Sequence, residues 1–239
     1  MNKHYLRTIG LCLCLYGTGS FAGILAEKTR VIYPQGQREV SLRLNNTNDY
    51  PIMTQFWVDH GVGDPDTAKA PFLVLNPMFQ LKAAETKGIR IILTQPNQVT
   101  DRESLYWLNM YEIPAVSAQG LTENHVNLSM NTQMKLIYRP TALKAPIWED
   151  IQKQLKFQIE IQGSETILTI SNPSNYYISM GSLKIFTANA QQRYGDTDKL
   201  MIEPQKTQRF KFETTQAIQY IEYSLIDDDG HHLAFKHIF

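Results

Sequence analysis

Residues 126–140 read Val-Asn-Leu-Ser-Met-Asn-Thr-Gln-Met-Lys-Leu-Ile-Tyr-Arg-Pro, and this stretch is the most informative part of the chain. Val126, Leu128 and Met130 alternate with polar residues, so one face of the segment is apolar. Alternation with a period of two is typical of a β-strand, because successive side chains point to opposite faces of a sheet. The pattern fits a half-buried strand of a sandwich. It equally fits an edge strand that offers apolar side chains to a partner, and periodicity alone does not separate the two.

The chain on both sides of this stretch carries further short strand-like segments. Residues 38–44 place Val40, Leu42 and Leu44 on one face, and turn-forming residues follow at 45–49. Many short strands separated by turn residues predict antiparallel β-sandwiches. The expected strands are residues 38–44, 53–58, 88–93, 105–113, 126–130, 134–138, 157–161, 166–171, 176–186, 208–212 and 220–226.

The 239 residues suit two domains of about 100 residues each. Residues 139–146 contain two prolines and separate two strand-rich halves, so they resemble a connector. The segment 147–155 that follows is amphipathic and predicts a short helix. We therefore expect an all-β protein with one domain at residues 23–140 and a second at residues 141–239.

The first 22 residues have the pattern of a secretory signal peptide. Two basic residues and no acid precede an apolar run at residues 9–16, and Ser20 and Ala22 occupy the −3 and −1 positions of a cleavage site. A cut after Ala26 is a weaker alternative, because bulky Ile24 would occupy −3. The apolar run is shorter than the roughly 20 residues that span a bilayer. We expect an exported protein without stable membrane insertion.

Charge and cysteine content exclude several classes of function. The chain has 23 Lys and Arg against 23 Asp and Glu, so it lacks the basic field that nucleic-acid binding requires. A hydrophobic fraction of 43% argues against intrinsic disorder. Cys12 and Cys14 both lie in the expected signal peptide, so the mature chain has no thiol for catalysis, a disulfide or a metal site.

Catalytic motifs with a fixed spacing are absent from the sequence. It contains no Gly-x-Ser-x-Gly, no phosphate-binding glycine-rich loop and no His-Glu-x-x-His. His231, His232 and His237 lie beside three aspartates at 227–229, but adjacent histidines on a strand point to opposite faces. We expect a hairpin turn with Gly230 at positive φ, no cofactor and no metal. A metal-dependent enzyme at these histidines remains as an alternative hypothesis.

Several stretches jointly match one protein family. The most specific is residues 101–109, Asp-Arg-Glu-Ser-Leu-Tyr-Trp-Leu-Asn. Over nearly the whole mature chain, the sequence resembles periplasmic pilus-assembly chaperones, the PapD-like family. The other matching stretches are Thr-Arg-Val-Ile-Tyr-Pro at 29–34, Gln-Phe-Trp-Val at 55–58, Asn-Pro-Met-Phe-Gln-Leu at 76–81, Lys-Leu-Ile-Tyr-Arg-Pro at 135–140 and Ser-Asn-Pro at 171–173.

The resemblance implies a fold and a function. The fold would be two immunoglobulin-like β-sandwich domains in an L-shaped arrangement. The function would be to bind pilus subunits, each an incomplete sandwich without its last strand, by lending them a strand (donor-strand complementation). The subunits would then pass to an outer-membrane usher. Self-association of the free chaperone over the same edge strand is left open by the sequence.

The resemblance also assigns roles to individual residues. Arg30 and Lys135 would hold the terminal carboxylate of the subunit. Val126, Leu128 and Met130 would be the apolar anchors of the donated strand, each contributing about 1.5–3 kcal/mol if fully buried. Without the resemblance, the two cations would be interpreted as exposed residues of little energetic consequence.

Two further features are implied by the resemblance alone. Glu103, Arg139 and Asp228 would form a salt-bridge network that joins the two domains. Pro77, which follows Asn76, would have a cis peptide bond. The segment between residues 113 and 126 carries no paired cysteines, so the chain fits the short-loop branch of the family.

A secreted adhesin or carbohydrate-binding module on the same kind of sandwich is the main alternative. Such a module predicts exposed aromatic residues that cluster on loops at one end of the sandwich. Trp57 and Trp107 instead fall within expected strands, and Trp148 follows the connector. The distribution of tryptophan therefore favours the chaperone interpretation.

Overall fold

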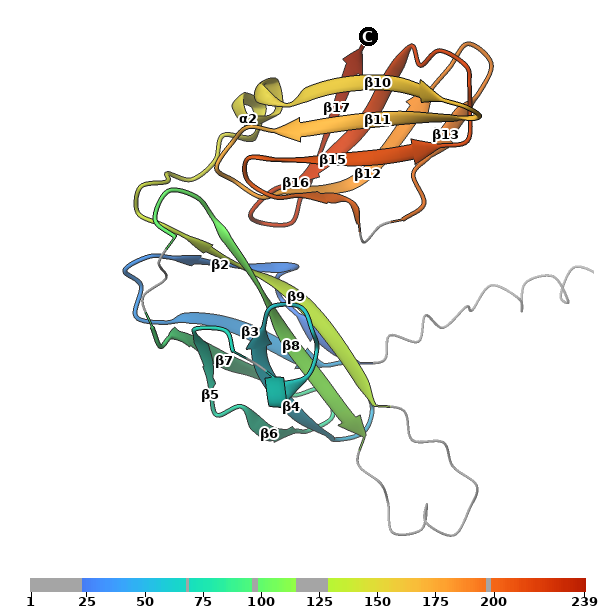
Figure 1. The fold of residues 1–239 in the computed structure, drawn as a ribbon. Helices are drawn as coiled ribbons and strands as arrows, with labels where there is room; N and C mark the ends of the chain where they lie inside the picture. The colour runs from blue at the N-terminus through green and yellow to red at the C-terminus, as the bar shows by residue number, and fades with distance from the viewer. Residues whose placement is uncertain (1–22, 68, 96–98, 115–128, 197–198) are drawn as a thin grey trace, which may run out of the picture.

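The computed structural model describes residues 23–67, 69–95, 99–114, 129–196 and 199–239, which form two β-sandwiches (Figure 1). Each sandwich consists of two sheets packed against one another. The two sandwiches adjoin, and β10 and β11 of the second run across the direction of β8 and β9 of the first (Figure 1). The prediction of an all-β fold with two sandwiches is confirmed. No described helix is long and apolar enough to cross a membrane.

The first sandwich pairs a four-stranded sheet, β1-β3-β7-β5, with a five-stranded sheet, β2-β9-β8-β4-β6. The predicted alternation is present, since Leu42, Leu44 and Leu108 are 0% exposed and lie in the core between the sheets. A shift of one residue would turn these side chains outward, so burial fixes the register of each strand. The elements are β1 (Ile24–Ala26), β2 (Arg30–Pro34), β3 (Val40–Asn46), β4 (Ile52–Asp59), η1 (Pro65–Thr67), β5 (Phe72–Leu75), β6 (Met78–Leu81), β7 (Thr86–Leu93), β8 (Ser104–Pro114) and β9 (Met130–Arg139).

Strand β9 has different neighbours along its length. From Met130 to Tyr138 it pairs antiparallel with β8, from Glu112↔Met130 to Ser104↔Tyr138. Its second half also pairs in parallel with β2, and this pairing begins at Arg30↔Lys135. Along residues 130–134, β8 is the only partner among the described strands. This half of β9 is therefore an open edge to which another strand can be added.

The second sandwich pairs the sheet β10-β11-β15 with the sheet β13-β12-β16-β17, and β14 lies beside β12. The helix predicted at residues 147–155 is present as α2 (Trp148–Gln154). Its Trp148 and Ile151 pack into the core of this sandwich, which explains the amphipathic pattern. The strands are β10 (Lys156–Gln162), β11 (Glu165–Asn172), β12 (Ile178–Phe186), β13 (Gln191–Arg193), β14 (Met201–Ile202), β15 (Lys206–Phe212), β16 (Tyr220–Ile226) and β17 (His232–Ile238).

The hairpin predicted at residues 227–230 connects β16 to β17. Gly230 has a φ of 92°, and its N–H donates to the carbonyl of Asp227 at 3.1 Å. A Cβ atom on Gly230 would collide with the Thr29 hydroxyl of the first sandwich. Glycine is required here both by the turn and by the close approach of the two sandwiches.

The strand boundaries differ from the prediction in two places. Met130 and Met134 belong to one continuous strand, because the polar residues between them stay in register with β8. The strand expected from residue 176 begins at Ile178 instead. Side chains of Asn172 and Ser174 take the hydrogen bonds of the Tyr176 backbone, so Tyr176 lies in a turn.

The prediction of a cis peptide bond at Pro77 is wrong, since no described peptide bond is cis. Between β5 and β6 the chain crosses from one sheet to the other, and Asn76 changes its direction with a φ of 55°. Asparagine tolerates this left-handed conformation better than most residues. The turn is made without a cis bond, and the Pro77 carbonyl accepts the Phe56 N–H at 2.8 Å.

Candidate functional site

Arg30 and Lys135 lie side by side where the two sandwiches meet. They are register partners on β2 and β9. The Nη1 atom of Arg30 donates to the carbonyl of Ile226 at 3.1 Å, and the Nζ atom of Lys135 donates to the hydroxyl of Ser179 at 3.1 Å. Ile226 and Ser179 both belong to the second sandwich. The structure therefore brings the two predicted cations together, and we call them the cation pair.

The cation pair carries positive charge that no described carboxylate contacts directly. Arg30 is only 5% exposed, and its buried Nε atom has no hydrogen-bond partner. No carboxylate of the described residues forms an ion pair with Arg30 or Lys135. A buried donor without a partner costs about 1–3 kcal/mol. The cation pair is thus suited to receive an anion from outside the chain.

The pKa values of the cation pair show the effect of bringing two cations out of water. Burial lowers the pKa of Lys135 to about 8, and repulsion from Arg30 adds to this shift. Burial also lowers the pKa of Arg30, while the charges of Asp228, Asp227 and Glu103 oppose the change. A bound carboxylate would favour the charged form of both side chains. A guanidinium offers a carboxylate a planar fork of donors, and an ammonium offers it a point charge.

Glu103, Arg139 and Asp228 form a closed cluster, which we call the salt-bridge cluster. The Nε atom of Arg139 donates to Glu103 Oε1 at 2.8 Å. Its Nη1 and Nη2 atoms donate to the two carboxylate oxygens of Asp228 at 2.6 and 2.9 Å. The other oxygen of Glu103 accepts the N–H of Tyr177 at 2.8 Å. Because Asp228 and Tyr177 belong to the second sandwich, the cluster connects the two sandwiches.

The members of the salt-bridge cluster are paired, but they are buried to different degrees. The side chains of Glu103, Arg139 and Asp228 are 2%, 9% and 28% exposed. Burial raises the pKa of Glu103, although Arg139 and the Tyr177 N–H act in the opposite direction. Against the effect of burial, the hydrogen bonds to Asp228 and the charge of Glu103 raise the pKa of Arg139. Removal of Arg139 would leave Glu103 charged in a buried place without a counter-ion.

Met130 is the one predicted anchor that the structure describes, since Val126 and Leu128 lie outside the described residues. Met130 begins β9, on the half of the strand whose second edge is open, and it is 54% exposed. A flexible, polarisable methionine can pack on apolar surfaces of different shape. Its position is consistent with an anchor for a strand laid along this edge.

Side-chain amides that no sequence pattern marks hold this half of β9. Asn109 of β8 is 0% exposed, and its Oδ1 atom accepts hydrogen bonds from Asn131 and Gln133 of β9, both at 3.0 Å. These bonds add to the backbone ladder between the two strands. The alternation of β9 predicts only that Asn131 and Gln133 point outward. Their contact with Asn109 depends on the register, which the pattern does not give.

The second sandwich supplies groups that no sequence pattern marks. They are the hydroxyl of Ser179, the carbonyl of Ile226 and the N–H of Tyr177. Two of the three are backbone groups, which almost any residue could provide. Only the folded arrangement of the two sandwiches identifies them.

The histidines do not form a metal site. His231 bonds to Asp227 through its Nδ1 atom at 3.1 Å, His232 lies 3.4 Å from a serine hydroxyl, and the ring of His237 stacks on Phe157 at 4.3 Å. The described residues contain no group of three or more His, Cys, Asp or Glu that could hold a metal. The geometry gives the metal-enzyme hypothesis no support.

The tryptophans do not form a loop cluster either. Trp57 lies in β4 and Trp107 lies in β8, and Trp148 is only 8% exposed in the core of the second sandwich. None of the three therefore offers the exposed ring on a loop that a carbohydrate-binding module needs.

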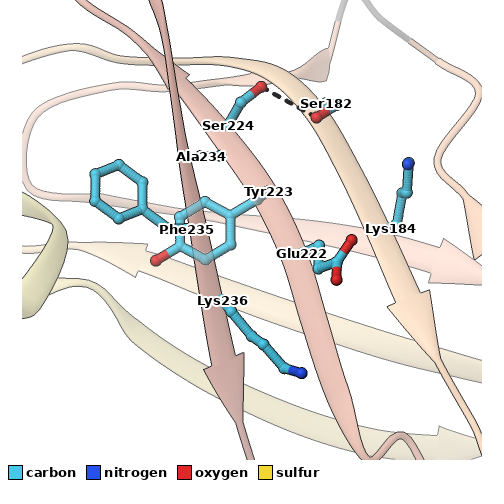
Figure 2. A pocket seen from close by; sticks show the side chains of 8 residues that line it. All are labelled: Ser182, Lys184, Glu222, Tyr223, Ser224, Ala234, Phe235 and Lys236. Carbon is cyan, nitrogen blue, oxygen red and sulfur yellow. Dashed lines mark hydrogen bonds between the residues drawn. The ribbon is translucent and has the colours of Figure 1, made fainter.

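A pocket on the second sandwich contains none of the predicted site residues (Figure 2). Lys184, Glu222 and Lys236 stand opposite one another on β12, β16 and β17. Such a row of alternating charge stabilises a sheet. The small side chains of Ser224 and Ala234 leave the hollow beside this row (Figure 2). The pocket is explained by the packing of the sheet, and we assign it no binding role.

Comparison with known proteins identifies the family. Residues 23–144 match the family model described as pili and flagellar-assembly chaperone, PapD N-terminal domain. Residues 150–236 match the model described as pili assembly chaperone PapD, C-terminal domain. The two matches cover both sandwiches.

Individual relatives agree with the family models. The chain is 35% identical to the chaperone protein FocC of Escherichia coli over 167 residues, which are 69% of this chain and 70% of the relative. It is 32% identical to the chaperone protein LpfB of Salmonella typhimurium over 237 residues, which are 96% of this chain and 95% of the relative. Among solved structures, the Salmonella enterica SafA pilin in complex with the SafB chaperone matches with a TM-score of 0.72 and 27% identity, covering 92% of this chain and 97% of that chain.

Proposed function

The chain belongs to the PapD family of pilus-assembly chaperones, which is not an enzyme family, and we propose that it binds pilus subunits by strand donation. The observation that carries this proposal is the position of the cation pair. It lies where the open edge of β9, along residues 130–134, ends and the pairing of β9 with β2 begins. The similar SafB chaperone has been solved in complex with the SafA pilin, which supports the same kind of partner for this chain.

The geometry supports a defined register for the bound subunit. A subunit strand added beside residues 130–134 cannot continue past Lys135, because β2 already occupies that edge. The strand would therefore end at the cation pair, with its terminal carboxylate on Arg30 and Lys135. It would run in the same direction as β9, as β2 does. A fixed end is needed because a slip of one residue would turn every anchor away from the subunit.

Apolar burial would supply further affinity. Val126, Leu128 and Met130 would fill the groove that the missing strand leaves in the subunit, each contributing up to about 1.5–3 kcal/mol. Ordering the donated strand opposes this gain, so the sum is an upper bound. Met130 lies about 17 Å from Lys135 along an extended strand, which separates the apolar contacts from the carboxylate contact.

The salt-bridge cluster would serve this function indirectly. It ties Arg139, four residues after Lys135 on β9, to the β16–β17 hairpin of the second sandwich. We propose that it fixes the angle between a domain at residues 23–140 and a domain at residues 141–239. Ser179 and Ile226 would then stay beside the cation pair.

Export and delivery complete the proposal. Cleavage after Ala22 would release the chain into the periplasm, where subunits arrive, and the loaded chaperone would deliver them to an outer-membrane usher. Neither a cofactor nor a nucleic acid takes part. A second copy of the chaperone could cover the open edge when no subunit is bound.

An affinity pull-down from the host periplasm tests the proposal. The tagged chain should recover small fimbrial subunits, identified by mass spectrometry, and Lys135→Ala should recover almost none. Lys153→Ala is the matched control, since it removes a cation from an exposed ion pair that should contribute little. Equal recovery by all three proteins would contradict the role of the cation pair. Leu128→Glu tests the donated strand separately, because it would place a charge in an apolar groove.

A further inference from the structure

Glu112 is a buried carboxylate without a cationic partner, at the opposite end of β8 from Glu103. Only 7% of Glu112 is exposed. Its Oε1 atom accepts a hydrogen bond from Asn48 Nδ2 at 2.9 Å, and its Oε2 atom accepts the N–H of Ile24 at 3.0 Å. Within the described part of the chain, no lysine, arginine or histidine forms an ion pair with it. A carboxylate at this depth is expected to meet a positive charge.

Gly23 lies against this carboxylate. Its N–H donates to Asn48 Oδ1 at 3.1 Å, and its carbonyl accepts hydrogen bonds from the N–H and the hydroxyl of Thr47 at 3.0 and 2.8 Å. The Oε2 atom of Glu112 is 3.5 Å from the point where a Cβ atom on Gly23 would lie. The backbone of Gly23 is therefore fixed on both sides, and its nitrogen and the Glu112 carboxylate both bond to the side-chain amide of Asn48.

We infer that Gly23 is the first residue of the mature chain and that its α-ammonium group is the missing partner of Glu112. The inference rests on the export proposed above. Hydrolysis of the Ala22–Gly23 bond consumes one water, gives Ala22 a carboxylate and turns the Gly23 amide into an amine, which is protonated at neutral pH. The amide has one N–H, already donated to Asn48, whereas the ammonium has three. Signal removal would thus create a buried ion pair that the precursor does not have.

The geometry also discriminates between the two cleavage sites in the sequence. A cut after Ala26 would remove Gly23 and all of β1, including the pairing Ile24↔Asn46. It would leave Glu112 without the Ile24 N–H and without any cation. A cut after Ala22 preserves these contacts and adds a charge where one is needed.

A cycle of tag removal and substitution tests the ion pair. The chain is prepared with an N-terminal tag whose protease cuts directly before Gly23, and thermal unfolding is followed near pH 6.5 before and after cutting. Freeing the amine should raise the midpoint by about 2–8 °C. Glu112→Gln keeps the size and an acceptor but removes the charge, so the rise should disappear. The matched control Glu39→Gln, at an exposed carboxylate of the same sandwich, should retain it. An equal rise with and without the Glu112 charge, or no rise in the unsubstituted chain, would overturn the inference.

The intact mass of the protein purified from the periplasm separates this inference from the proposed function. A mature chain that begins at Gly23 supports both. A cut at another bond overturns only the role of Gly23, because the chain would still be exported. An uncut chain found only in the cytoplasmic fraction would contradict export itself.

Discussion

Lys135 and Arg139 lie four residues apart on the same face of β9, yet their surroundings are opposite. Arg139 contacts two carboxylates, and its side chain is 9% exposed in a cluster where each charge has a partner. Lys135 has a serine hydroxyl and a neighbouring cation, and no described carboxylate pairs with it. Both residues bridge the two sandwiches. We therefore expect the complete set of charges, the salt-bridge cluster, to hold the two sandwiches together, and we propose that the incomplete set, the cation pair, is available for a ligand.

The largest effect on the free energy of unfolding is expected from a change in the salt-bridge cluster. Arg139→Leu removes the cation and leaves Glu103 as a buried carboxylate without a partner, which should lower the free energy of unfolding by about 3–5 kcal/mol. Urea unfolding of the purified chain measures it. Arg30→Leu is the matched control, because it removes an arginine that has no carboxylate partner and should leave stability unchanged or slightly higher. Equal losses for the two variants would remove the distinction between the clusters.

Changes in the cation pair should instead have the larger effect on the affinity for a subunit. Arg30→Ala and Lys135→Ala each remove a charge-assisted hydrogen bond to the carboxylate, worth about 1.5–3 kcal/mol, or roughly 10- to 150-fold in the dissociation constant. The dissociation constant of a captured subunit measures this loss, with thermal unfolding run in parallel. Unchanged binding, or a loss of binding explained by unfolding, would show that the cation pair is structural.

The sequence predicts the strands better than the contacts between them. The alternation in β3 correctly places Leu42 and Leu44 in the core, because a half-buried strand leaves a period of two. Strands β1 and β2 have three and five residues, too few to show a reliable period, and β2 begins with a buried arginine, Arg30, which an apolar pattern does not mark.

The residues of the candidate site are even harder to predict from a local sequence pattern than the contacts between strands. Only the family resemblance predicts the charged residues of the site, which are Arg30, Glu103, Lys135, Arg139 and Asp228. Their partners Ser179, Ile226 and Tyr177 come from another sandwich, and two of them act through the backbone. The contact of Ile24 with Glu112 joins residues 88 positions apart. Such contacts depend on register and domain packing, which no local pattern encodes.

A change of pH should move stability and binding in opposite directions at Lys135. Its pKa is about 8 in the folded chain and 10.5 in the absence of the fold. Below pH 8 the folded state bears the full cost of burying the charge, and this cost disappears as the pH rises from 8 to 10.5. Stability should therefore gain from Lys135 in this window. Subunit affinity should fall there by up to about tenfold per pH unit, because the neutral amine no longer attracts a carboxylate.

Binding titrations and urea unfolding between pH 7 and 10 check both directions. Lys135→Arg is the control, since its guanidinium stays charged throughout this range and should remove the pH dependence of binding in the same window. If both proteins show the same decline in affinity, another group is responsible and the cation pair does not set the response.

The smallest effect is expected at Asp228, the most exposed member of the complete set. With 28% of its side chain exposed, Asp228 is partly solvated, so Asp228→Asn should lower the free energy of unfolding by only about 0.5–1.5 kcal/mol. The amide keeps one acceptor for Arg139, which still holds Glu103 at 2.8 Å.

Glu103→Gln is the matched change at the 2% exposed carboxylate and should lower the free energy of unfolding further. The reason is that the two oxygens of Glu103 accept separate hydrogen bonds, one from Arg139 and one from the Tyr177 N–H. Urea unfolding of the two variants side by side gives the order. A larger loss at Asp228 than at Glu103 would mean that the hairpin contact, rather than the buried pair of Arg139 and Glu103, holds the sandwiches together.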